Sequence, residues 1–176
     1  VFEMKLENLT INFLGDSITE GCCASAPSKG FVSLIAQATG CVCRNYGIGG
    51  TRIARQSKAS TPTRHDLDFP SRVPTIDHNA DLIVVFGGTN DFGHGDAPLG
   101  VMGDRDVYTF YGALECLYSA LETHYRKDQI VILTPLHRYD LEDCCPLEDY
   151  VNAIRQVAKA HDLTVFDLYE DSVMHP

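Results

Sequence analysis

The sequence has little positive charge for its length. Of 176 residues, 14 are Lys or Arg and 24 are Asp or Glu, which gives a formal net charge of −10. Nucleic-acid-binding domains and anionic membrane surfaces both call for basic protein surfaces, so the sequence argues against either partner. The 44% hydrophobic and 22% charged residues also exclude a disordered chain. We therefore expect a single soluble globular domain over residues 1–176.

Long apolar runs are also absent. No stretch reaches the roughly 18 apolar residues that a membrane span needs. Residues 1–5 do not open a signal peptide, because no charged segment there is followed by an apolar one. These absences predict a cytoplasmic protein. The chain starts without Met and runs almost at once into core sequence, so we expect its first residues to be missing.

The seven cysteines lack the spacing of a metal site or a disulfide framework. No C-x-x-C motif occurs, and an odd number leaves at least one thiol unpaired. We expect reduced thiols that act as small hydrophobic residues, with no metal and no cofactor; an oxidised extracellular form is the alternative. The cysteines are Cys22, Cys23, Cys41, Cys43, Cys116, Cys144 and Cys145.

Apolar runs alternate with helical periodicity along the whole chain. The runs predict strands at residues 9–14, 41–46, 82–86, 130–133 and 163–166. Helices are expected at residues 31–38, 107–125 and 147–157, and only short helical pieces in the proline-interrupted segment 57–80. This alternation predicts an α/β fold, a three-layer α/β/α sandwich around a flavodoxin-like parallel five-stranded sheet. In such sheets, ligands bind beyond the carboxyl ends of the strands.

Polar and glycine residues follow each predicted strand. A serine hydroxyl beside glycine N–H groups and an asparagine side chain has the parts of an acyl-transfer site: a nucleophile and donors for an oxyanion. Each motif alone could be a turn or a helix cap, but their joint arrangement favours a site. The five sets are Gly15-Asp16-Ser17, Gly49-Gly50, Gly88-Thr89-Asn90-Asp91, Thr134-Pro135-Leu136-His137-Arg138 and Asp167.

Three of these motifs resemble the conserved blocks of the GDSL/SGNH hydrolase superfamily. The first block is similar to residues 15–21, the second to residues 45–50 and the third to residues 88–91. The resemblance implies hydrolysis of a small-molecule ester or acetyl group through an acyl-enzyme, without a metal. The resemblance implies that Ser17 is the nucleophile. It also implies that Gly50 and Asn90 donate hydrogen bonds to the oxyanion, with the Ser17 N–H as the remaining donor. Asp16 and Asp91 are candidate substrate-binding residues beside them.

The general base is left open by the sequence. The family's last block is Asp-x-x-His, often followed by Pro, whereas this chain ends in Asp171-Ser172-Val173-Met174-His175-Pro176, with Ser172 at the Asp position. Either His175 is the base, with Asp171 as an off-register partner or as part of a dyad, or the true block lies beyond Pro176. We favour the second reading, in which the domain lacks its C-terminal segment, because family members normally carry one more helix after that block.

The other histidines carry little weight. His137 follows the fourth strand and could contact a substrate. His65, His78 and His94 are expected in polar loops near acidic residues, with a surface position as the default.

The leading hypothesis is a serine esterase that acts on small acyl or acetyl esters, including those of carbohydrates. The Gly, Pro and acidic residues of loops 92–106 and 138–146 favour a neutral or polar substrate over a long lipid. A catalytically inactive relative that binds a ligand at the strand ends is the alternative. A nucleotide or phosphate binder is the third reading, and the acidic balance argues against it. The sequence does not indicate which oligomeric state the protein has.

Overall fold

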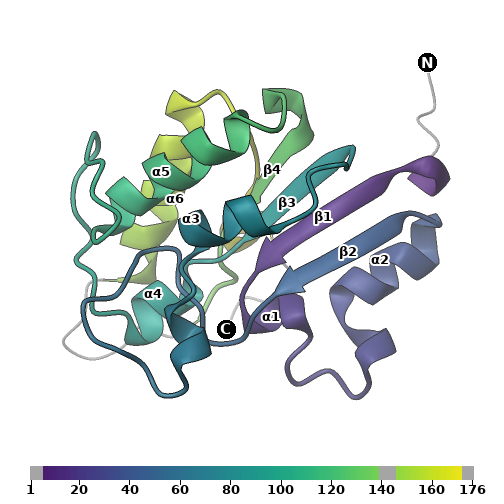
Figure 1. Cartoon of the computed structure of the whole chain (residues 1–176), viewed down its shortest axis with the longest axis horizontal. Coiled ribbons are helices and arrows are strands. Elements are labelled where there is room, and N and C mark those ends of the chain that lie inside the picture. The colour runs from purple at the N-terminus through teal and green to yellow at the C-terminus, as the bar shows by residue number, and fades with distance from the viewer. Residues whose placement is uncertain (1–5, 139–145, 172–176) are drawn as a thin grey trace.

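A computed structural model describes residues 6–138 and 146–171 of the chain (Figure 1). Five parallel strands form one sheet in the order β2-β1-β3-β4-β5, which is the flavodoxin-like order. The structure therefore confirms the predicted α/β class. The strands are β1 (Thr10–Gly15), β2 (Val42–Gly47), β3 (Leu82–Phe86), β4 (Ile130–Leu133) and β5 (Thr164–Phe166).

The register of the sheet places three strand ends level with one another. Gly15, the last residue of β1, pairs with Gly47 of β2 on one side and with Phe86 of β3 on the other. The motifs that follow these three strands therefore leave the sheet side by side. In Figure 1, β1 and β2 point toward α1 (Ser17–Glu20) at this carboxyl edge.

Seven helices occur in the described part of the chain, several of them shorter than sequence periodicity can detect. The predicted helix 107–125 is shorter than expected, because Thr109 caps its start and it ends at Glu122. The proline-rich segment forms short helical pieces, as predicted. No described helix is long and apolar enough to cross a membrane. Besides α1, the helices are α2 (Phe31–Thr39), α3 (Phe69–Arg72), α4 (Thr89–His94), α5 (Phe110–Glu122), α6 (Leu147–Ala160) and α7 (Leu168–Asp171). The 3-10 turns are η1 (Leu6–Asn8), η2 (Pro27–Lys29), η3 (Thr63–Asp66), η4 (Val73–Thr75) and η5 (Lys127–Gln129).

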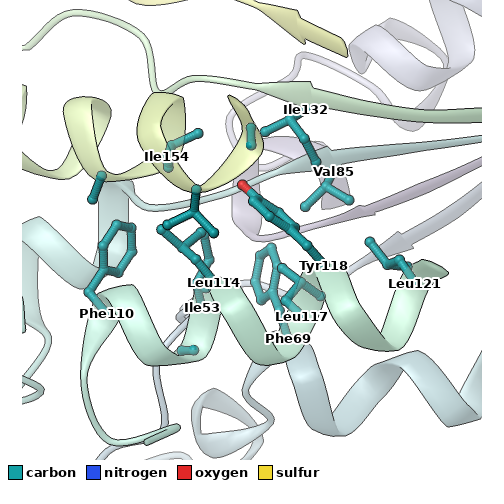
Figure 2. Packing of buried hydrophobic residues seen from close by; sticks show 14 of the residues in the cluster. Ile53, Phe69, Val85, Phe110, Leu114, Leu117, Tyr118, Leu121, Ile132 and Ile154 are labelled. Atoms are coloured by element: carbon teal, nitrogen blue, oxygen red, sulfur yellow. The ribbon is translucent and has the colours of Figure 1, made fainter. Parts of the chain in front are cut away.

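The main core lies between one face of the sheet and helices α3, α5 and α6. Figure 2 shows Leu114, Leu117 and Tyr118 of α5 packed among side chains of the strands and of α6. All three are fully buried, as are Ile83 and Ile132 of the sheet. Alternate residues of β3 and β4 thus hold this layer in place, which fixes the position of the site-bearing edge.

The other face of the sheet is only partly covered in the described structure. Helix α2 packs on β1 through Val32 and Phe31. Beside it runs a groove of about 680 Å³ whose lining is apolar, and Phe166 on β5 is 59% exposed. The continuation of the domain beyond Pro176 stays a prediction.

The cysteines of the described residues are free thiols. Cys41 is buried in the cluster under α2 and behaves as the small hydrophobic residue expected from the sequence. Cys22 and Cys23 are exposed just after α1, with their sulfur atoms 3.4 Å apart. The Cys144-Cys145 pair lies outside the described residues.

Candidate active site

The structure brings Ser17, Gly50 and Asn90 to the same edge of the sheet. Ser17 is the first residue of α1, Gly50 lies in the turn after β2, and Asn90 is the second residue of α4 after β3. The Asn90 Nδ2 donates to the Thr51 carbonyl oxygen at 2.9 Å, directly next to Gly50. A methyl group on Gly49 would lie 3.6 Å from the Ser17 Cβ. The three predicted catalytic residues therefore come from neighbouring strand ends and form one cluster.

Ser17 is held at the start of a one-turn helix by Asp16. The Asp16 Oδ1 accepts from the Ile18 N–H at 2.9 Å and caps α1. Being the first helical residue, Ser17 has an N–H group without an intrahelical acceptor. Its hydroxyl has no hydrogen-bond partner among the described residues, and the side chain is half-buried. Ser17 thus combines an available hydroxyl with an available N–H.

Gly50 is a position where only glycine fits. Its φ of +77° lies in the left-handed region, and the ring of His65 fills the space that a Cβ would need, within 2.4–2.6 Å. The N–H of the preceding Gly49 donates to the Glu20 carboxylate at 2.8 Å. The Gly50 N–H, by contrast, has no acceptor in the part of the chain that is described. Of the two glycines, Gly50 therefore has the N–H left for a ligand.

The Asn90 side chain is 9% exposed and is fixed at both ends of its amide. One Nδ2 hydrogen goes to Thr51 O, and the Oδ1 lies 3.2 Å from the His94 Nε2. The second Nδ2 hydrogen has no partner among the described residues. Ser17, Gly50 and Asn90 thus each offer one N–H donor.

The two candidate substrate-binding carboxylates bond backbone groups instead of facing open space. The two oxygens of Asp91 accept from the N–H groups of Ile53 and Ala54 at 2.9 and 2.8 Å. Burial raises the pKa of Asp91 to about 7. Burial likewise raises the pKa of Asp16 to about 6, against the Ile18 N–H and Arg72, which lower it. Both carboxyl groups hold site-bearing segments, and contact with a substrate stays a prediction for them.

Arg72 is a buried cation that sequence reasoning missed. Its guanidinium donates to the carbonyl oxygens of Gly15 and Tyr46 and to the Thr51 hydroxyl, and so joins the ends of β1 and β2 to the turn after Gly50. Burial lowers its pKa to about 10. A single arginine in a proline-rich segment carries no sequence signal for this role.

Two histidines lie closer to the site than the sequence predicted. His94 was expected in a surface loop, but it ends α4 and contacts Asn90 one turn earlier. His65 lies in η3 and covers Gly50. The α4 helix is only six residues long, so no periodic pattern could place Asn90 and His94 on one face. The ring of His137 stacks on Tyr169, with centroids 4.7 Å apart.

The candidate general base, His175, lies outside the described residues. Asp171 is the last residue of α7 and is exposed, while Ser172 and His175 belong to the segment that is not described. Within residues 6–138 and 146–171, no group of three or more His, Cys, Asp or Glu side chains could hold a metal ion.

The chain folds as a three-layer α/β protein of flavodoxin-like architecture, and a serine, a glycine and an asparagine lie together at the carboxyl ends of its strands. The sequence model of the GDSL-like lipase/acylhydrolase family matches residues 13–176, and the chain belongs to this family. Family membership supports hydrolysis of ester substrates as the class of reaction. No protein with a curated description matches the chain.

Solved structures agree with this fold. A protein from Lactobacillus plantarum is 28% identical, with a TM-score of 0.81 over 95% of this chain and 80% of its own. A possible lipase from Chitinophaga pinensis is 22% identical, with a TM-score of 0.72 over 96% of this chain and 70% of its own. A lipase/acylhydrolase from Enterococcus faecalis is 22% identical, with a TM-score of 0.62 over 96% and 80%.

Proposed function

We propose that the protein is a serine esterase that cleaves small acyl or acetyl esters through an acyl-enzyme on Ser17. The observation that carries the proposal is the meeting of a free serine hydroxyl with three N–H groups that have no acceptor among the described residues. These N–H groups belong to the Ser17 backbone, the Gly50 backbone and the Asn90 side chain. Hydrogen-bond donors that already point at the place where negative charge develops make the largest single contribution to the rate enhancement of many acyl-transfer enzymes.

The reaction follows from these positions. The Ser17 Oγ attacks the ester carbonyl carbon while a histidine base takes the hydroxyl proton, and the carbonyl oxygen becomes an oxyanion bound by the three N–H groups. The C–O bond to the alcohol then breaks, and the base returns its proton to the leaving alcohol. Water attacks the acyl-enzyme in the same way and releases the acid. The base is His175 or a histidine beyond Pro176.

A small polar acyl ester fits the surroundings of the site best. The loops after β3 and β4 are rich in Gly, Pro and acidic residues, and the chain carries a net charge of −10. This composition favours a neutral or polar substrate over a long acyl chain, and the exposed Val101 and Met102 give the first of these loops a short apolar surface. Acetylated carbohydrates are the substrate class that we propose, with no nucleic acid or membrane partner.

The test is hydrolysis of p-nitrophenyl acetate together with labelling by a fluorophosphonate probe. We expect the probe to modify Ser17 and Ser17→Ala to abolish both labelling and turnover. Asn90→Ala should lower kcat by about 10²- to 10³-fold, the usual effect of losing one oxyanion donor. Ser33→Ala is the matched control, because Ser33 lies on α2 and bonds the Pro27 carbonyl away from the site.

Two results would contradict the proposal. Turnover that survives in Ser17→Ala would exclude the serine mechanism. A folded wild-type protein that neither hydrolyses the ester nor reacts with the probe would favour the alternative, a ligand-binding relative without catalysis.

A further inference from the structure

We propose that His94 and Arg52 are positioning residues that set the orientation of the Asn90 amide toward the substrate. This inference rests on the proposed esterase function, in which Asn90 donates to the oxyanion. It concerns a chain of three side chains, Arg52–His94–Asn90, of which the reaction above uses only Asn90. The chain is held by contacts of 3.0 Å between Arg52 and His94 and of 3.2 Å between His94 and Asn90.

The arginine decides which nitrogen of His94 carries the proton. A guanidinium nitrogen can only donate, so the His94 Nδ1 that faces the Arg52 guanidinium must accept. The neutral ring then carries its hydrogen on Nε2, which faces the Asn90 Oδ1. Burial, and after it the positive charge of Arg52, lowers the pKa of His94, and this keeps the ring neutral. His94 is therefore a fixed donor to Asn90.

That donor, together with Thr51, allows one orientation of the amide. In the observed orientation Oδ1 accepts from His94 and Nδ2 donates to the Thr51 carbonyl oxygen. A flipped amide would place Oδ1 against that carbonyl oxygen and Nδ2 against the His94 N–H, so both contacts would become repulsive. The second Nδ2 hydrogen is thus directed in advance, which is the condition for a donor to stabilise a transition state without reorganisation.

Arg52 cannot easily leave this arrangement, because its other end is also occupied. It is 4% exposed, and its second terminal nitrogen donates to the Ser60 hydroxyl at 2.6 Å and to the Asp66 carboxylate at 3.3 Å. Asp66 also accepts from the Ser60 N–H at 2.9 Å and follows His65, whose ring covers Gly50. The same arginine therefore supports both the segment that carries Asn90 and the segment that covers Gly50.

The first experiment compares two substitutions of His94 that differ in hydrogen bonding. His94→Phe keeps a ring but has no hydrogen-bond donor. We expect kcat to fall by about 10- to 100-fold with little change in KM, which is less than the loss expected when the Asn90 donor itself is removed. His94→Gln places an N–H donor near the position of Nε2 and should restore most of the rate. His124→Phe is the matched control, since His124 is an exposed residue between α5 and β4, at the amino edge of the sheet, where its ring stacks on that of His78.

A double-variant comparison separates positioning from general damage. In an Asn90→Ala background, His94→Phe should have no further effect on kcat, because the amide that it orients is gone. Equal activity of His94→Phe and wild type would overturn the inference. So would a His94→Phe loss of the same factor in both backgrounds, which would indicate a merely structural role.

The histidine tautomer tests the inference without any catalysis. In the ¹⁵N spectrum of histidine-labelled protein, His94 should have a protonated Nε2 and an unprotonated Nδ1, and Arg52→Met should release this preference. A protonated Nδ1 in the wild type would overturn the inference. If Ser17→Ala retains the wild-type rate, the esterase proposal fails, whereas the tautomer measurement still decides the fate of the Arg52–His94–Asn90 chain.

Discussion

At the scale of single residues, polar side chains around the site bind backbone groups that would otherwise be unpaired. Asp91 accepts from two N–H groups, and Asn45 joins the Thr19 carbonyl oxygen to the Gly47 N–H. Such bonds matter because a buried N–H without an acceptor costs about 1–3 kcal/mol. The turn after Gly50 is thus held by side chains instead of by regular secondary structure.

Asp91→Ala tests this role. The change leaves the N–H groups of Ile53 and Ala54 without acceptors and opens a small cavity, so we expect the free energy of unfolding to fall by about 2–4 kcal/mol at pH 5. Urea denaturation followed by circular dichroism measures this. Asp128→Ala is the control: Asp128 pairs with Arg126, both side chains are 71% exposed, and its removal should cost less than about 0.5 kcal/mol. Equal losses of unfolding free energy in the two variants would contradict the role of Asp91 as an acceptor for these backbone N–H groups.

At the scale of elements, the position of Ser17 depends on how closely α1 approaches the end of β2. A Cβ on Gly47 would lie 2.1 Å from the backbone nitrogen of Glu20, the last residue of α1. The contact involves backbone atoms, which cannot rotate away. Helix α1 can therefore pack this closely against the end of β2 only because residue 47 has no side chain.

Gly47→Ala should push α1, and with it Ser17, away from the sheet. We expect a loss of about 1–3 kcal/mol in unfolding free energy and a marked fall in esterase rate, because overpacking forces a backbone shift. Gly30→Ala is the matched control, since its φ is −65° and a Cβ there meets its nearest neighbour at 3.4 Å. Stability and rate should stay near those of wild type in the control. A fully active and stable Gly47→Ala protein would show that α1 is not fixed in this way.

Elements with a long apolar pattern could be predicted, and short or long-range features could not. The runs Leu82–Phe86 and Ile130–Leu133 form strands with the predicted bounds, because both are apolar on successive residues. Helices α1 and α4 have four and six residues, too few for a 3.6-residue period. The contact between Arg52 and His94 spans 42 residues, and only the assembled sheet brings them together.

At the scale of the whole molecule, the order of the strands in the sheet determines which segments meet at the site. Because β1 lies between β2 and β3, three motifs separated by tens of residues leave the sheet next to one another. This follows from the flavodoxin-like order and explains why motif order along the chain could predict Ser17, Gly50 and Asn90 together. The acidic composition also acts on the whole molecule. The net charge reaches −10 at pH 7, and repulsion between the carboxylates destabilises the folded state more as more of them ionise.

The stability of the whole molecule should therefore be greatest in mildly acidic solution. The pKa values of Asp91 and Asp16 are raised by burial to about 7 and about 6, above the usual value of 3.8. The folded state thus binds more protons than the unfolded state, and the stability that these groups contribute is lost as pH rises through the folded pKa values. In contrast, hydrogen bonds from Ser60 lower the pKa of Asp66, whose contribution is lost as pH falls below about 4.

Denaturant unfolding at pH 3 to 8 measures this balance. Between pH 5 and pH 8 the unfolding free energy should fall by about 4 kcal/mol, because one pKa unit corresponds to about 1.4 kcal/mol. Asp91→Asn removes the group with the larger shift and should show roughly a third of that decrease, whereas Asp128→Asn should keep all of it. A stability that rises from pH 5 to pH 8, or an unchanged slope in Asp91→Asn, would mean that the Asp91 carboxylate is charged in the folded protein throughout this range. Its two backbone N–H bonds would then outweigh its burial.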